Sequence, residues 1–316
     1  MSSGKVSRRW VRRGYSTAEE TQKCWVQKSV QSPCPARLWV LGGALKGQAS
    51  TLKYDLVSKQ WTAGPSLLQE RDGPAVTSHQ NVIYVVGGKN NSGPMASVER
   101  MEPNQDWQPA PSLQIARRRH AVVTIGNCIM ALGGLASKRG DRGPIAPNEV
   151  LQLDICRAWE KIACCRVPRW GLAAVASHDC VYALGGIDGA GDSCASVEVY
   201  SLSTDSWADA PSMHESRYNV GAAMSGNFIY AVGGRQGQDF LDCVERFSLK
   251  TCVWEKVASL QTPRCCCEVV AVDGRIFALG GYGRSGRLSS VERFDPHQEV
   301  WIIVDELPGA RNCMAA

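Results

Sequence analysis

The chain has 316 residues, of which 44% are hydrophobic and 21% are charged, and its formal net charge is +5. Residues 1–36 carry seven basic and two acidic side chains, so the rest of the chain is neutral overall. A neutral body lacks the basic footprint of a nucleic-acid-binding protein. No apolar run approaches the roughly 18 residues of a membrane span. We therefore expect neither nucleic acid nor membrane as a partner.

Residues 1–36 are polar and basic and follow neither a helical nor a strand period. We expect a solvated, disordered tail, in which Arg8-Arg9-Trp10-Val11-Arg12-Arg13 could also act as a nuclear signal. No apolar segment of a secretory signal opens the chain. The fourteen cysteines follow no spacing that repeats from unit to unit. These features predict reduced thiols and a cytoplasmic location, with a nuclear one as the alternative.

From residue 37 onward the chain repeats a single pattern, a short apolar run that ends in two glycines. The pairs are Gly42-Gly43, Gly87-Gly88, Gly133-Gly134, Gly185-Gly186, Gly233-Gly234 and Gly280-Gly281. One tryptophan follows each pair, and an arginine stands ten residues later, namely Arg71, Arg117, Arg169, Arg217, Arg264 and Arg311. Since consecutive pairs lie 45 to 52 residues apart, the pattern indicates a repeat architecture.

These residues resemble the kelch repeat, in which an apolar strand ends in Gly-Gly and a tryptophan follows within a unit of about 50 residues. The resemblance covers residues 37–316 and is closest to the kelch part of BTB–kelch proteins. It implies an all-β fold, a six-bladed kelch β-propeller with four antiparallel strands in each blade.

Four strands can be assigned within each unit. The first begins just after the arginine, and a polar turn such as Gly126-Asn127 or Asp273-Gly274 leads to the strand before the glycines. The third strand reads Val-Glu in most units, but Leu52 and Leu151 stand at the glutamate position in units one and three. The fourth holds the tryptophan, which we expect to fill the core between blades rather than to stack on a ligand.

The closure of the ring is a separate expectation. The first unit begins at its Gly-Gly strand, so the innermost strand of blade one has to come from another part of the chain. The segment after Arg311 matches the start of a first strand. We therefore predict that the C-terminal segment pairs with Leu38–Leu41 and removes the open sheet edge. Residues 24–31 are the competing candidate.

No constellation of catalytic or cofactor-binding residues is present in the sequence. It contains no nucleophile elbow, phosphate loop or zinc-protease motif. Cys164-Cys165 and Cys265-Cys266-Cys267 are adjacent rather than spaced as metal ligands. We therefore expect no enzyme activity, no cofactor and no metal. The run after Arg264 could be a redox-responsive group, but small apolar strand residues are the favoured interpretation.

The resemblance implies a protein-interaction module. Its relatives are substrate receptors of cullin-type ubiquitin ligases, which bind the cullin through a BTB domain, so a cullin is expected only if a longer form carries that domain. The alternative is a cytoskeletal or scaffold protein, since some kelch proteins bind actin.

The variable loops between the second and third strands all belong to one rim, where surface loops commonly carry binding function. The resemblance implies a protein or short acidic peptide as the partner on this rim. It places one set of contacts just after the glycine pair and another just after the periodic arginine. Residue by residue, the first set is Lys89, Arg235 and Tyr282, and the second set is Arg118, Arg119, Trp170, Tyr218 and Asn219. Arginine and aromatic side chains are typical of recognition surfaces. The alternative for Arg118 and Arg119 is that they only solvate a strand end.

Overall fold

The computed structural model describes residues 37–41, 51–55, 58–137, 143–152 and 158–314. The chain divides into two units, residues 1–36 and residues 37–316. The expected disordered tail is the first unit and lies outside the described residues.

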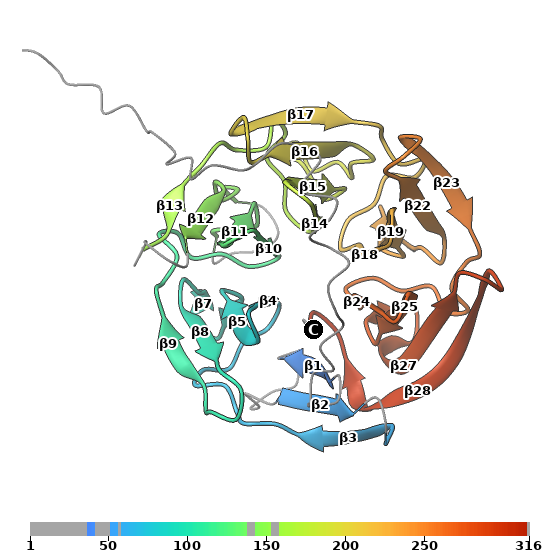
Figure 1. Ribbon diagram of the computed structural model, residues 1–316, viewed down its shortest axis with the longest axis horizontal. Helices are drawn as coiled ribbons and strands as arrows, with labels where there is room; N and C mark the ends of the chain where they lie inside the picture. Colours follow the sequence, from blue (N-terminus) through green and yellow to red (C-terminus); the bar gives the residue numbers. More distant parts are fainter. Residues whose placement is uncertain (1–36, 42–50, 56–57, 138–142, 153–157, 315–316) are drawn as a thin grey trace, which may run out of the picture. The chain divides into compact units, whose positions relative to one another are not determined.

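The described part of the second unit contains no helix and forms the six blades of a β-propeller, as the sequence predicted (Figure 1). Each blade is an antiparallel sheet in which the strands follow one another outward from the centre. Blades one to three consist of β1 (Arg37–Leu41), β2 (Thr51–Asp55), β3 (Gln60–Ala63); β4 (Ala75–His79), β5 (Val82–Val86), β8 (Val98–Met101), β9 (Gln108–Ala110); β10 (Ala121–Ile125), β11 (Cys128–Leu132), β12 (Glu149–Gln152), β13 (Glu160–Lys161). Blades four to six consist of β14 (Ala173–Ser177), β15 (Cys180–Leu184), β16 (Val197–Ser201), β17 (Ser206–Ala210); β18 (Gly221–Ser225), β19 (Phe228–Val232), β22 (Val244–Ser248), β23 (Val253–Val257); β24 (Glu268–Val272), β25 (Arg275–Leu279), β27 (Gly286–Asp295), β28 (Val300–Arg311).

Short strands line the loops beyond the glycine pairs. They are β6 (Lys89–Asn90), β7 (Gly93–Pro94), β20 (Arg235–Gln236), β21 (Asp239–Phe240) and β26 (Tyr282–Gly283). The predicted hairpin turns at the other end of the blades are confirmed, because Gly126 and Asp273 have φ angles of 54° and 49°. Such positive φ angles suit Gly, Asn and Asp.

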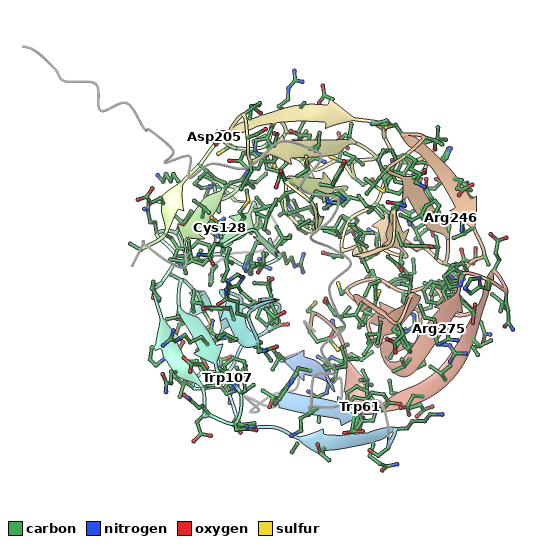
Figure 2. All side chains as sticks on the ribbon, viewed as in Figure 1. Trp61, Trp107, Cys128, Asp205, Arg246 and Arg275 are labelled. Carbon is green, nitrogen blue, oxygen red and sulfur yellow. The ribbon has the colours of Figure 1, made fainter. Side chains whose placement is uncertain are left out.

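The core lies between the blades. Among the described residues, the buried apolar side chains form six clusters, one at each junction of neighbouring blades. The tryptophans fill these junctions, as predicted: Trp159 is 1% exposed, and its Nε1 donates to the Pro111 carbonyl of the preceding blade at 2.8 Å. Figure 2 shows Trp61 and Trp107 in the first two blades.

Buried ion pairs hold the connections that enter blades two to six to the sheet that each one enters. Arg217 is fully buried, and its Nη2 donates to Glu245 of β22 at 2.5 Å. Its Nη1 donates to the carbonyls of Gly233 and Cys243 at 2.9 and 3.0 Å. The pairs of this kind are Arg71–Glu99, Arg117–Glu149, Arg169–Glu198, Arg217–Glu245 and Arg264–Glu292. The periodic arginines of blades two to six are therefore structural.

One of these pairs corrects the sequence analysis. The expectation that unit three lacks the glutamate is wrong, because Glu149 at the start of β12 pairs with Arg117. The sequence alone favours Val150-Leu151 as the start of this strand, with Leu151 at the glutamate position. Because Glu149 holds that position instead, the loop before the strand is two residues shorter than expected. Blade one does carry Leu52 at this place, buried between blades one and six.

The glycine pairs turn the chain where another backbone lies very close. Gly233 and Gly234 have φ angles of 59° and 103°. A Cβ atom on Gly233 would lie 2.4 Å from the carbonyl oxygen of Arg264. Both the positive φ and the lack of space therefore require glycine.

A chain of backbone hydrogen bonds runs around the centre of the ring, two residues past the periodic arginines. The donors and acceptors are Gly171 to Arg119, Asn219 to Gly171, Cys266 to Asn219, Cys313 to Cys266 and Gly73 to Cys313, at 2.7 to 3.0 Å. The C-terminal segment thus occupies the innermost place of blade one and joins blade six to blade two. In the other blades the inner strand begins four residues after the arginine, which here is residue 315. Residues 24–31 and 315–316 lie outside the described residues, so strand pairing with Leu38–Leu41 stays a prediction.

Candidate binding surface at one rim

The residue after each of the first five periodic arginines pairs with the residue after the next glycine pair. Tyr218 and Arg235 exchange two backbone hydrogen bonds of 3.0 and 2.9 Å, and Cys265 and Tyr282 exchange two of 2.9 and 2.8 Å. The corresponding bridges in the other blades are Asp72 to Lys89, Arg118 to Leu135 and Trp170 to Ile187. The position directly after the arginine and the position directly after the glycine pair therefore lie side by side in blades two to six, on the rim that carries the loops between the second and third strands.

Side chains of blades three to six form a continuous series along this rim. The Arg119 guanidinium lies 5.1 Å from the centre of the Trp170 ring, and Trp170 meets Tyr218 nearly edge-on at 5.9 Å. Arg235 lies 5.9 Å from the Tyr218 ring and 4.8 Å from the Phe240 ring. Phe240 and Tyr282 are 6.0 Å apart. We call this series the Arg–aromatic row: Arg119, Trp170, Tyr218, Arg235, Phe240 and Tyr282.

Burial and hydrogen bonds fix the rings of the row on the side that faces the blades, and the other side of the row faces solvent. Trp170 is only 5% exposed, whereas Tyr282 is 41% exposed. Burial raises the pKa of Tyr218, whose hydroxyl donates to the Gly237 carbonyl at 3.2 Å. Arg235 donates to the carbonyl and side-chain oxygens of Gln238 at 3.1 and 2.9 Å. Stacking on rings and these bonds hold the guanidinium groups in place, so a partner would meet an ordered cationic surface.

Three of the eight residues predicted for the site lie apart from the row. Lys89 is in blade two and forms an ion pair with Asp72 at 3.1 Å. Arg118 is 7% exposed, so it is less available to a partner than expected. Asn219 belongs to the hydrogen-bonded ring at the centre and lines a cavity of about 160 Å³ there.

Sequence reasoning missed Phe240. It lies on β21, opposite Arg235 in the small hairpin beyond the fifth glycine pair. The available signal was an aromatic residue directly after the polar run Arg235–Asp239, within a class of loop that the sequence analysis assigned to binding.

Two of the histidines, His120 and His214, have structural surroundings. His120 is buried, and burial followed by the charge of Arg117 lowers its pKa to about 3, so the imidazole is neutral. His214 contacts Glu245 through Nδ1 at 2.8 Å, next to Arg217. Among the described residues, no three His, Cys, Asp or Glu side chains are grouped to hold a metal ion. The same residues contain no helix that could cross a membrane.

Six antiparallel sheets around an axis, tied by buried ion pairs and glycine turns, define a β-propeller of repeated blades. Residues 119–312 match the family model described as the KLHDC2/KLHL20/DRC7 Kelch-repeats domain, and residues 70–114 match the Kelch motif. The chain therefore belongs to the kelch-repeat family.

Curated relatives agree with this assignment. The chain is 29% identical to Kelch-like protein 36 of Bos taurus over 70% of its length, and 27% identical to Kelch-like protein 23 of Homo sapiens over 66%. It is 26% identical to Beta-scruin of Limulus polyphemus over 63%. These alignments span 38%, 38% and 22% of the respective relatives, so the chain corresponds to less than half of each. Homology to such proteins is consistent with a protein-interaction module.

Proposed function

We propose that this propeller recognises a short acidic peptide on the Arg–aromatic row, as the substrate-recognition part of a cullin-type ubiquitin ligase adaptor in the cytoplasm. The observation that carries the peptide proposal is the placement of two guanidinium groups, Arg119 and Arg235, on aromatic rings along one rim. The ligase role extends it by the likeness to Kelch-like proteins.

The chemistry of the row suits carboxylates. A guanidinium group offers a planar fork of N–H donors that matches a carboxylate. Because these N–H groups lie in the guanidinium plane, stacking the face of that plane on a ring does not cover them. Tyr282 and Phe240 add rigid apolar area beside it. The preferred segment would therefore carry Asp, Glu or phosphate groups flanking a small apolar residue.

Proximity labelling in cells tests the binding face. The double variant Arg119→Ala/Arg235→Ala should lose a defined group of partners at unchanged thermal stability. Arg275→Ala is the matched control, because Arg275 is an exposed arginine at the start of β25, at the end of that strand away from the glycine pair. Figure 2 labels it in blade six. An unchanged partner set in the double variant would exclude this face.

The ligase role is tested separately. If a longer form carries a BTB segment, it should co-purify with a cullin, and the partners lost in the double variant should accumulate when that form is depleted. Co-sedimentation of the propeller with actin filaments, without any cullin association, would favour the cytoskeletal alternative.

A further inference from the structure

Three thiol groups meet where the ring closes. The sulfur atoms of Cys265 and Cys266 are 3.7 Å apart. Cys266 and Cys313 line the same central cavity. The backbone N–H of Cys313 donates to the Cys266 carbonyl at 3.0 Å. All three are free cysteines in the structure.

The junction between blades six and one lacks bonds that other junctions have. The Nε1 atom of Trp61 in blade one has no hydrogen-bond partner, whereas Trp107 and Trp254 donate to carbonyls of the preceding blade. Leu52 replaces the glutamate of the buried ion pair. Among the described residues, the first sheet has three strands rather than four.

The C-terminal segment supplies contacts that partly replace the missing bonds of this junction. Met314 is 4% exposed and packs in a cluster with Val40, Leu52 and Leu279. Cys313 donates to Cys266 of blade six and accepts from Gly73 of blade two. A cross-link between Cys313 and Cys266 would therefore stabilise the junction between blades six and one, where only a few residues of the C-terminal segment hold the two blades together.

The Cα separation is in the range of a disulfide. With standard bond lengths, one N–H···O=C bond of 3.0 Å keeps the two Cα atoms roughly 5–6.5 Å apart. Disulfides span Cα distances of about 4.4–6.8 Å. The neighbouring Cys265 is less suitable, because a disulfide between adjacent residues closes a small, strained ring with the backbone.

We propose that oxidation by a peroxide joins Cys266 and Cys313 in a disulfide that closes the propeller covalently. One sulfur, as thiolate, attacks a peroxide oxygen, so that an S–O bond forms and the O–O bond breaks. The second sulfur displaces the hydroxyl group from this sulfenic acid, forming the S–S bond. Both protons leave on the two oxygens as water, and two electrons pass from the sulfurs to the peroxide.

The surroundings make this a slow modification rather than a rapid sensor. Contact with the Cys265 thiol raises the pKa of Cys266 well above its ordinary value, and contact with Cys266 does the same for Cys313. Arg119 lowers both pKa values, and Asp72 raises that of Cys313, but the net shift of each is upward. Only a small fraction of either group is thiolate at neutral pH, so reaction requires sustained oxidation.

Peptide mapping tests the proposal. The reduced protein is treated with hydrogen peroxide, its remaining thiols are alkylated, and it is digested without reductant. We expect one linked pair of peptides containing Cys266 and Cys313. The thermal midpoint should rise by about 7 °C on oxidation, because the link closes a loop of nearly fifty residues. Dithiothreitol should reverse both changes.

Three variants make the result specific. Cys313→Ser and Cys266→Ser should each abolish the link and the rise in midpoint, and either one suffices if the other does not fold. Cys265→Ser should keep both. A Cys265–Cys266 link, a disulfide between two molecules, or no link at a dose that oxidises the exposed Cys164 and Cys252 would overturn the proposal. So would a link that leaves the midpoint unchanged.

Discussion

Removing one partner of a buried Arg–Glu pair should cost far more stability than removing the same residue type at the surface. In the Glu245→Ala variant, Arg217 keeps its bonds to the Gly233 and Cys243 carbonyls but loses its counter-charge. The backbone N–H groups of His214 and Glu215, which donate to Glu245 at 2.7 and 3.1 Å, lose their acceptor as well.

The size of the effect follows from burial. Both side chains are 0% exposed, and breaking such a pair leaves an uncompensated charge that costs about 3–5 kcal/mol. With an unfolding entropy of about 2.1 cal/mol/K per residue over roughly 280 residues, a loss of about 4 kcal/mol lowers the thermal midpoint by about 7 °C. Glu255→Ala is the control, since Glu255 contacts Arg246 at the same 2.5 Å but is 50% exposed. It should cost less than about 1 kcal/mol.

Thermal unfolding followed by tryptophan fluorescence measures both variants. The double variant Arg217→Met/Glu245→Leu removes both charges and should regain part of the loss, because blade one already carries Leu52 at the glutamate position. If Glu245→Ala stays within about 2 °C of the unaltered protein, or if the double variant is less stable than the single one, the ion pairs do not fasten the blades.

Two further predictions concern glycine and pH. Gly233→Ala should cost about 3 kcal/mol or more, because its Cβ would meet the Arg264 carbonyl, whereas Gly237→Ala, with a similar φ of 58° and no atom within 4 Å, should cost about 1 kcal/mol; urea unfolding compares them. Stability should fall as the pH drops from 6.5 toward about 3, because the unfolded chain takes up a proton at His120 that the folded protein excludes. The slope should reach up to about 1.4 kcal/mol per pH unit. The variant His120→Phe should flatten it, and His178→Asn, at an exposed position, should not.

The fold could be predicted from the sequence because its characteristic residues are close together in the chain and recur in successive units. Gly-Gly, Trp and Arg each do the same structural task in successive blades, so their spacing indicates the blades before any contact is known. Register was predicted less well where only apolar pattern was available. Val150-Leu151 looked like the start of a strand, and only the pairing of Arg117 with Glu149 shows where that strand begins.

The site was harder to predict because stacking joins different blades. Spacing placed Arg119, Trp170 and Tyr218 on one rim, but the contact of Arg119 with Trp170 depends on how neighbouring connections lie against each other. Phe240 joins the row through a hairpin present in only some units. The burial of Arg118 depends on its surroundings in three dimensions, which one repeat does not encode.

Peptide selection on the purified propeller, followed by titration of a selected peptide, tests the proposed binding face most directly. We expect the selected peptides to be rich in Asp and Glu. Arg119→Ala and Arg235→Ala should each weaken the binding of these peptides by roughly 10- to 100-fold, as expected for loss of a charged hydrogen bond of about 1.5–3 kcal/mol. Arg275→Ala should leave the affinity unchanged. Peptides without acidic residues, or acidic peptides that bind both rim variants as tightly as the unaltered protein, would contradict the account.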